Sequence, residues 1–187
     1  MNPTAPLEAV FASTRQVMAN IQADQMQEAT PCASWNVGEV INHVIGAQDF
    51  WVAGMTGTPP SGESQNWAEG DYLAAYDQAT SAALAAFQED GALQKMVALP
   101  FGEMPGGAVM GLAMNDTFTH GWDLAKATGQ DTNLAPEIAQ AILAQAQQNI
   151  QEGFRGEDGQ APFGQAQDCP EGACAADQLA AFLGRQV

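Results

Sequence analysis

Three side chains able to bind a metal ion stand out in this sequence: His43, Asp116 and His120. The chain contains only two histidines, and the residues around each follow the apolar spacing of an amphipathic helix. Asp116 precedes His120 by four residues, so both side chains project from the same face of a helix. Two imidazoles and a carboxylate suit Zn²⁺, with Ni²⁺ or Fe²⁺ as alternatives, and they leave coordination positions open.

The spacing by itself leaves a second interpretation open. A D-x-x-x-H pattern often arises by chance, and the same residues also suit structural roles. His43 could be a satisfied core histidine, and Asp116 and His120 could serve packing or a local hydrogen bond. Two ligands one turn apart on one helix, with a third from a neighbouring helix, is nevertheless a common way to build a metal site in a bundle. Spacing does not establish that His43 meets the other two.

Residues near these positions suit either a role at the site or a structural one. Asp123 follows His120 by three residues and suits either a hydrogen bond that orients a ligand or a surface charge. Cys32 has no basic residue near it in the sequence that would favour its thiolate, so we interpret it as a buried structural thiol. Four aromatic residues suit the lining of a site, although such residues more often belong to the core: Trp35, Phe50, Trp51 and Trp122.

Helices are expected to position these side chains. Apolar residues at helical spacing predict helices over about 6–24, 37–53, 71–88, 109–127, 136–152 and 177–183, with a loop over 54–70. Thr4 is expected to cap the first helix, and Asn36 with Glu39 forms the capping-box pattern that starts the second. Residues 96–99 resemble a short strand followed by turns, which predicts a small hairpin or ordered loop. We therefore predict an all-α fold with four main helices, in one domain over residues 1–187.

Charge and composition restrict the function classes. The chain of 187 residues has 22 acidic and 5 basic residues, a formal net charge of −17. Phosphate backbones and anionic lipids would repel it, so we expect no nucleic acid and no membrane as partner. With no signal-peptide pattern and no apolar run long enough to span a bilayer, we expect a cytoplasmic protein. The sequence also lacks a Gly-rich phosphate loop and a Ser-His-Asp candidate with a free histidine.

The cysteines do not predict a disulfide framework. Their number is odd, namely Cys32, Cys169 and Cys174, and no signal-peptide pattern accompanies them. Cys169 and Cys174 are close enough in sequence to pair within the tail, but they lack the C-x-x-C spacing of a zinc ribbon or thioredoxin-like site. We assign them no chemistry.

Two segments resemble a known family. The first, within residues 30–46, contains T-P-C-A-S-W-N-V and I-N-H-V-I-G, and the second, residues 116–129, reads D-T-F-T-H-G-W-D-L-A-K-A-T-G. Both are similar to the DinB-like superfamily, in the actinobacterial branch related to the mycothiol-dependent maleylpyruvate isomerase metal-binding domain. The tail over residues 177–185 resembles an uncharacterised single-domain subgroup of that branch, so the resemblance covers nearly the whole chain.

This resemblance implies both a fold and a chemistry. The fold would be a DinB-like four-helix bundle with a short β-hairpin or ordered loop insertion and a small C-terminal helix. A divalent metal would lie between the second and fourth helices, on His43, Asp116 and His120. Many members carry histidine or glutamate where this chain has Asp116, and we expect the shorter aspartate to draw the ion closer to its helix or to bind it more weakly.

The implied activity is that of a thiol-dependent transferase or isomerase. Its cofactor beside the metal would be a low-molecular-weight thiol, mycothiol or bacillithiol by analogy, because a divalent ion can stabilise the nucleophilic thiolate. The substrate would be a small electrophile, and a homodimer is expected by analogy. The alternative is a metal-binding or small-molecule-binding protein of the same fold without catalysis.

Overall fold

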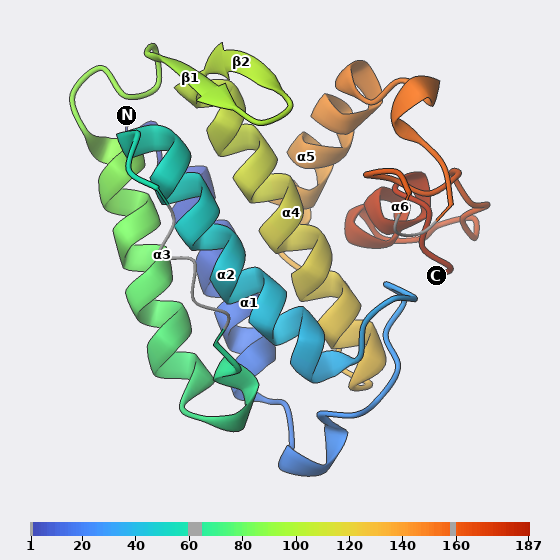
Figure 1. Ribbon diagram of the computed structural model, residues 1–187. Coiled ribbons are helices and arrows are strands. Elements are labelled where there is room, and N and C mark those ends of the chain that lie inside the picture. The colour runs from blue at the N-terminus through green and yellow to red at the C-terminus, as the bar shows by residue number, and fades with distance from the viewer. Residues whose placement is uncertain (1, 60–64, 158–159) are drawn as a thin grey trace.

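A computed structural model describes residues 2–59, 65–157 and 160–187 (Figure 1). The helices in these ranges are α1 (Ala5–Ala19), α2 (Val37–Thr56), α3 (Tyr72–Gln88), α4 (Gly106–Ala127), α5 (Pro136–Asn149) and α6 (Ala175–Phe182). Strands β1 (Met96–Leu99) and β2 (Gly102–Pro105) pair antiparallel between α3 and α4. The predicted all-α fold with a small hairpin is therefore confirmed.

Helices α1 to α4 form a four-helix bundle. Helix α1 packs against α3 and α4, and α2 packs against the same two helices. Figure 1 shows α5 and α6 beside α4, outside the bundle, and the hairpin at one end of it. Helices α5 and α6 contact each other and α4. Helix α4 thus connects the bundle to the C-terminal helices. In the described ranges, each helix is too short or too polar to cross a lipid bilayer.

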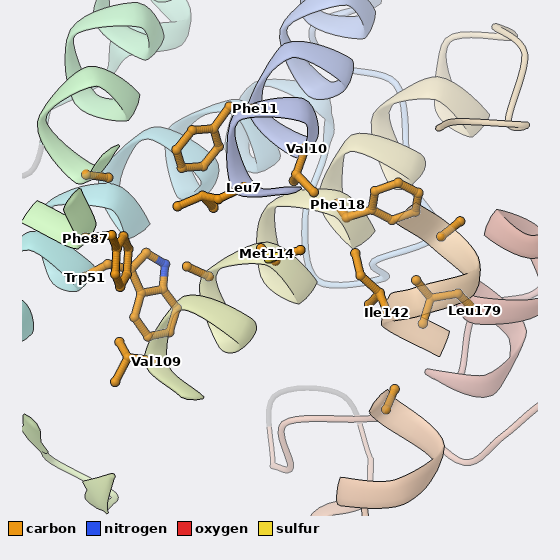
Figure 2. Close-up of a cluster of buried hydrophobic side chains, with 14 of the residues drawn as sticks. Leu7, Val10, Phe11, Trp51, Phe87, Val109, Met114, Phe118, Ile142 and Leu179 are labelled. Carbon is orange, nitrogen blue, oxygen red and sulfur yellow. The ribbon is translucent and has the colours of Figure 1, made fainter. Parts of the chain in front are cut away.

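An apolar interior holds these helices together. Figure 2 shows part of it, where Leu7 and Phe11 of α1 lie near Met114 and Phe118 of α4. The same cluster extends to α5 and α6 through Ile142 and Leu179. A second cluster fills the other half of the bundle with Val17, Met18, Val40, Ile41, Val44, Ile45 and Leu124. Burying one such large side chain contributes about 1.5–3 kcal/mol relative to leaving it in water.

Polar contacts fix the register of α4 against α1 and α2. The Thr14 hydroxyl of α1 donates to the backbone carbonyl of Thr117 at 3.1 Å, and the Gln48 amide of α2 donates to the Thr117 hydroxyl at 3.2 Å. Gly121 lies so close to α1 that a Cβ atom there would overlap Thr14 Oγ1. Thr117 and Gly121 lie within one turn of Asp116 and His120, so their contacts determine the direction in which these two side chains point.

The capping box predicted at the start of α2 is confirmed. The Asn36 backbone N–H donates to Glu39 Oε2 at 2.8 Å, and the Glu39 N–H donates to Asn36 Oδ1 at 2.9 Å. The helix then continues to Thr56 and ends at Gly57, whose φ of +73° is the left-handed conformation that glycine favours. It therefore extends three residues into the predicted loop, of which residues 60–64 lie outside the described residues.

The start predicted for the first helix is confirmed, but its side-chain cap and its end were wrong. Thr4 occupies the N-cap position, yet its hydroxyl bonds the side chains of Asn2 and Glu8 instead of a backbone N–H of the helix. The helix ends at Ala19 rather than near Asp24. Beyond it the Asn20 amide donates to the Gln16 carbonyl, one of those left free at the helix end.

Other helix bounds also differ from the prediction. Helix α4 begins at Gly106 rather than near residue 109, because the glycine lets its first turn approach the Ala92 carbonyl, where a Cβ would collide. Helix α5 ends at Asn149 instead of near residue 152. Helix α6 begins at Ala175 rather than at residue 177, because the Cys174 sulfur accepts the Asp177 N–H at 3.4 Å and caps the helix earlier.

A hydrogen bond between side chains connects α6 to α4. The Trp122 indole N–H donates to Asp177 Oδ1 at 2.8 Å. Burial raises the pKa of the Asp177 carboxyl, but hydrogen bonds from Trp122, Thr132 and Cys174 and the charge of Lys126 lower it by more, so the pKa lies below its ordinary value. The folded protein therefore favours the ionised form of this carboxyl.

We expect Asp177 to make folding sensitive to acid. Because its folded-state pKa is depressed, its stabilisation is complete above the unfolded-state pKa of about 4 and is lost as the pH falls through the folded value. The variant Asp177→Asn keeps an acceptor oxygen but cannot ionise. The free energy of unfolding, measured by denaturant titration, should exceed that of the variant by about 1 kcal/mol at pH 6, and the difference should shrink towards pH 3. A difference independent of pH would contradict this assignment.

Candidate metal centre

The structure brings the three predicted site residues together. His43 lies on α2, and Asp116 and His120 lie on α4. His43 Nε2 lies 3.1 Å from Asp116 Oδ1, and His120 Nε2 lies 3.8 Å from the same oxygen. The imidazole rings meet edge to face, with centroids 4.6 Å apart. One ligand atom from each residue falls within 4.8 Å of the others. Residues 73 positions apart in sequence thus share one point between two helices.

Helix α4 supplies a third side chain to the same face. Asp116, His120 and Asp123 occupy positions i, i+4 and i+7, which place them in a row along the helix. Asp123 is fully buried, and its Oδ2 lies 3.0 Å from His120 Nδ1. A carboxylate can only accept a hydrogen bond, so the proton of the imidazole lies on Nδ1. The lone pair of a neutral His120 is then on Nε2, the nitrogen nearer Asp116.

Asp116 has an unused acceptor. Its Oδ2 is buried and has no hydrogen-bond partner among the residues that the structure describes. Burial raises the pKa of the Asp116 carboxyl, but the hydrogen bond with His43 and the charges of His120, His43 and Arg185 lower it by more. The carboxyl is therefore held as an anion beside two imidazoles. A buried oxygen without a partner costs free energy, and a cation would satisfy it.

The donor set fits a divalent ion. Nitrogen and oxygen ligands of Zn²⁺ lie 2.0–2.2 Å from the metal, which in a tetrahedral arrangement places them about 3.4 Å from one another. The separations of 3.1 and 3.8 Å from Asp116 Oδ1 bracket this value. His43, Asp116 and His120 are therefore side chains that could hold a metal here.

Aromatic residues surround the site. The Trp35 ring lies against both imidazoles, with centroids 4.5 Å from His43 and 5.5 Å from His120. A hollow of about 460 Å³ opens beside His43 and Asp116. Its remaining lining is apolar and comes from α2: Gly46, Ala47, Phe50 and Trp51. Trp122 instead lies in the core, so of the four aromatic residues considered from sequence, three border the site.

Sequence reasoning missed Arg185. Its Nε donates to Asp123 Oδ1 at 3.2 Å and its Nη2 to Asp123 Oδ2 at 3.0 Å. Burial raises the pKa of the Asp123 carboxyl, but the hydrogen bond with His120, the charges of Arg185 and His120, and the hydrogen bond with Arg185 lower it by more. The available signal was indirect, because a buried helical aspartate needs a cation and the chain offers only five basic residues.

Cys32 lies beside the site rather than deep in the core. It is half-buried, and its sulfur lies within 4.8 Å of ligand atoms of His120 and Asp123. The interpretation of a buried structural thiol was therefore wrong about its burial. Cys169 and Cys174, both half-buried in the tail, form no disulfide with each other.

Comparisons with known proteins identify a family and two similar chains. A family model described as the mycothiol maleylpyruvate isomerase N-terminal domain matches residues 7–125. The chain is 38% identical over 190 residues to uncharacterized protein Rv0738 of Mycobacterium tuberculosis strain H37Rv and to uncharacterized protein MT0763 of strain CDC 1551. Each alignment covers the whole of both chains. No solved structure matches the chain.

Proposed function

The chain belongs to the mycothiol maleylpyruvate isomerase N-terminal domain family, and from this premise we propose that it is a metal-dependent transferase or isomerase that acts on a small electrophile with a thiol as cofactor. Its metal ligands would be His43, Asp116 and His120. The observation that carries the proposal is the convergence of two imidazole nitrogens on one carboxylate oxygen from two helices. The Asp116 Oδ2, which has no partner among the described residues, supports it, because a bound cation would satisfy this buried acceptor.

The donor set favours Zn²⁺, with Ni²⁺ or Fe²⁺ as alternatives. When bound, a divalent ion would supply Lewis acidity, which favours the thiolate form of a thiol such as mycothiol or bacillithiol. The protein's own residues do the positioning. Asp123 keeps the His120 proton on Nδ1, and Trp35 packs against both imidazoles and limits their rotation. The neighbouring hollow gives a small electrophile access to this point.

The polarity of the hollow favours an uncharged electrophile. Among the residues that the structure describes, its lining contains no lysine or arginine. The chain's basic residues are engaged elsewhere: Arg15 with Asp77, Lys95 with the Met55 carbonyl, Lys126 over the Trp122 ring, Arg155 with two backbone carbonyls, and Arg185 with Asp123. Phe50 packs edge to face on Trp51, and the exposed Phe101 of the hairpin stacks on Phe50. An apolar or aromatic substrate fits this wall better than an organic anion does.

Metal binding is the first test of the proposal. Zn²⁺ affinity, measured by competition with a chromophoric chelator, should fall more than about 100-fold in His43→Ala and in His120→Ala, because losing a ligand costs more than losing one of its outer hydrogen-bond partners. The matched control is Asp49→Asn, on the same helix as His43 but outside the cluster, which should keep the affinity within about twofold. Retention of full affinity in His43→Ala would reject the proposed ligand set.

Thiol transfer is the second test. The metal-loaded protein should accelerate the reaction of mycothiol with methyl 4-chloro-3-nitrobenzoate, in which the sulfur displaces chloride from the ring. Removal of the metal with a chelator should reduce the rate to that of the thiol alone, and Zn²⁺ should restore it. Equal rates with and without chelator would refute the enzymatic proposal. Metal binding without any acceleration would instead support a binding protein without catalysis.

Substrate charge is tested with a matched pair. The methyl ester and the free carboxylate of 4-chloro-3-nitrobenzoic acid differ in charge at the same ring. For each compound, the acceleration is the catalysed rate divided by the uncatalysed rate. We expect the acceleration to be larger for the ester than for the acid by about tenfold or more, because burying an unpaired carboxylate costs free energy. The variant Ala47→Lys, which adds a cation to the hollow, should narrow this ratio. Preference for the acid in the unaltered protein would contradict the assigned substrate polarity.

A further inference from the structure

Asp123 accepts hydrogen bonds from two directions. From α4 itself it receives the His120 Nδ1 proton, and from the C-terminal segment it receives two N–H groups of Arg185. The His120 and Arg185 Nη2 bonds end on the same oxygen, Oδ2, each at 3.0 Å. The Asp123 side chain has no exposed surface, and the Arg185 side chain is 13% exposed. These contacts form one chain of hydrogen bonds from the tail to the imidazole.

We propose that Arg185 is a positioning residue for the metal centre. Its two-pronged contact orients the Asp123 carboxylate, and that carboxylate in turn keeps His120 in the form with its proton on Nδ1 and with Nε2 directed at Asp116. The inference rests on the proposed function, since the ring it orients is one of the proposed ligands. It adds a residue that lies outside residues 7–125, the part matched by the family model.

Electrostatics explains why an arginine is needed. A carboxylate removed from water is strongly destabilised unless a cation and hydrogen bonds compensate it. His120 supplies one hydrogen bond, but an imidazole carries a positive charge only when it is protonated, whereas a guanidinium is always charged. The guanidinium supplies the charge and a planar pair of donors that fixes the carboxylate plane, which a lysine ammonium cannot do. A fixed carboxylate plane leaves the imidazole one preferred orientation.

The fold of the tail places Arg185 with little freedom. Its backbone N–H donates to the Ala180 carbonyl at 2.9 Å at the end of α6. The preceding Gly184 has a φ of +100° and packs on the backbone of Gly164, where any side chain would collide. The Trp122–Asp177 hydrogen bond attaches α6 to α4 one residue away from Asp123. The backbone contacts of this turn therefore hold the Arg185 guanidinium next to Asp123.

Arg155 provides a matched control, because it is a buried arginine of the same C-terminal region. Its side chain is 3% exposed and donates to the Gly164 and Phe182 carbonyls at 2.8 Å each. These two bonds, together with an ion pair to Glu152 and the contact of the guanidinium with the Phe182 ring, anchor the tail. If Arg185 only anchored the tail, the variants Arg185→Gln and Arg155→Gln would affect His120 to the same extent.

The test measures the His120 ring directly and then the metal. Two-bond ¹H–¹⁵N correlation spectra of the chelator-treated protein report the protonation state of each ring nitrogen, and a chain with two histidines gives two simple patterns. We expect a single form of His120 protonated on Nδ1 in the unaltered protein and in Arg155→Gln, and loss of that single form in Arg185→Gln. Zn²⁺ affinity should fall about 10–100-fold in Arg185→Gln and stay within about twofold in Arg155→Gln.

Each outcome decides the inference. Unaltered His120 signals and Zn²⁺ affinity in folded Arg185→Gln, or equal changes in the two variants, would overturn it. Should Arg185→Gln fail to fold, Arg185→Lys keeps the charge without the planar donor pair, and its affinity should fall about 3–10-fold with a mixed His120 pattern. If even the unaltered protein binds no metal, the proposed function fails, and the ring spectra alone still decide whether Arg185 orients His120.

Discussion

The hydrogen bond between His120 Nδ1 and the buried Asp123 is the interaction on which the site depends. It gives the two ring nitrogens different roles, one as a donor to a fixed carboxylate and one as an available lone pair. Without this hydrogen bond the ring could rotate, or its proton could move to Nε2. In either case Nε2 would no longer present a lone pair beside Asp116. Because both carboxylates lie on α4 with the imidazole between them, one rigid helix sets most of the geometry.

The bundle contributes the remaining precision by holding α2 against α4. Thr117, one residue after Asp116, receives hydrogen bonds from Thr14 of α1 and from Gln48 of α2. The glycine at position 121 allows α1 to approach closely. The position of His43 relative to Asp116 therefore follows from the packing of three helices rather than from any loop, and side chains on packed helices are held more accurately than those on loops.

Features encoded locally by familiar patterns could be predicted, and features that depend on distant contacts could not. The Asn36–Glu39 capping box and the shared face of Asp116 and His120 depend on residues within one turn, so spacing revealed them. The start of α6 was missed although a local contact decides it, because cysteine is not one of the residues that usually cap helices. The start of α4 was missed because a tertiary contact decides it, at Gly106 beside the Ala92 carbonyl. The partnership of Asp123 with Arg185 spans 62 residues, and no local pattern encodes it.

The division of the cluster between two helices has a thermodynamic consequence. His43 alone comes from α2, so an ion held by all three side chains would act as a reversible cross-link between segments 73 residues apart. Such a ligand binds the folded chain far better than the unfolded one, and by mass action it stabilises the fold by an amount that grows with its free concentration. Metal supply and the lifetime of the folded protein would then be coupled, so a change in metal availability would alter the amount of protein as well as its occupancy.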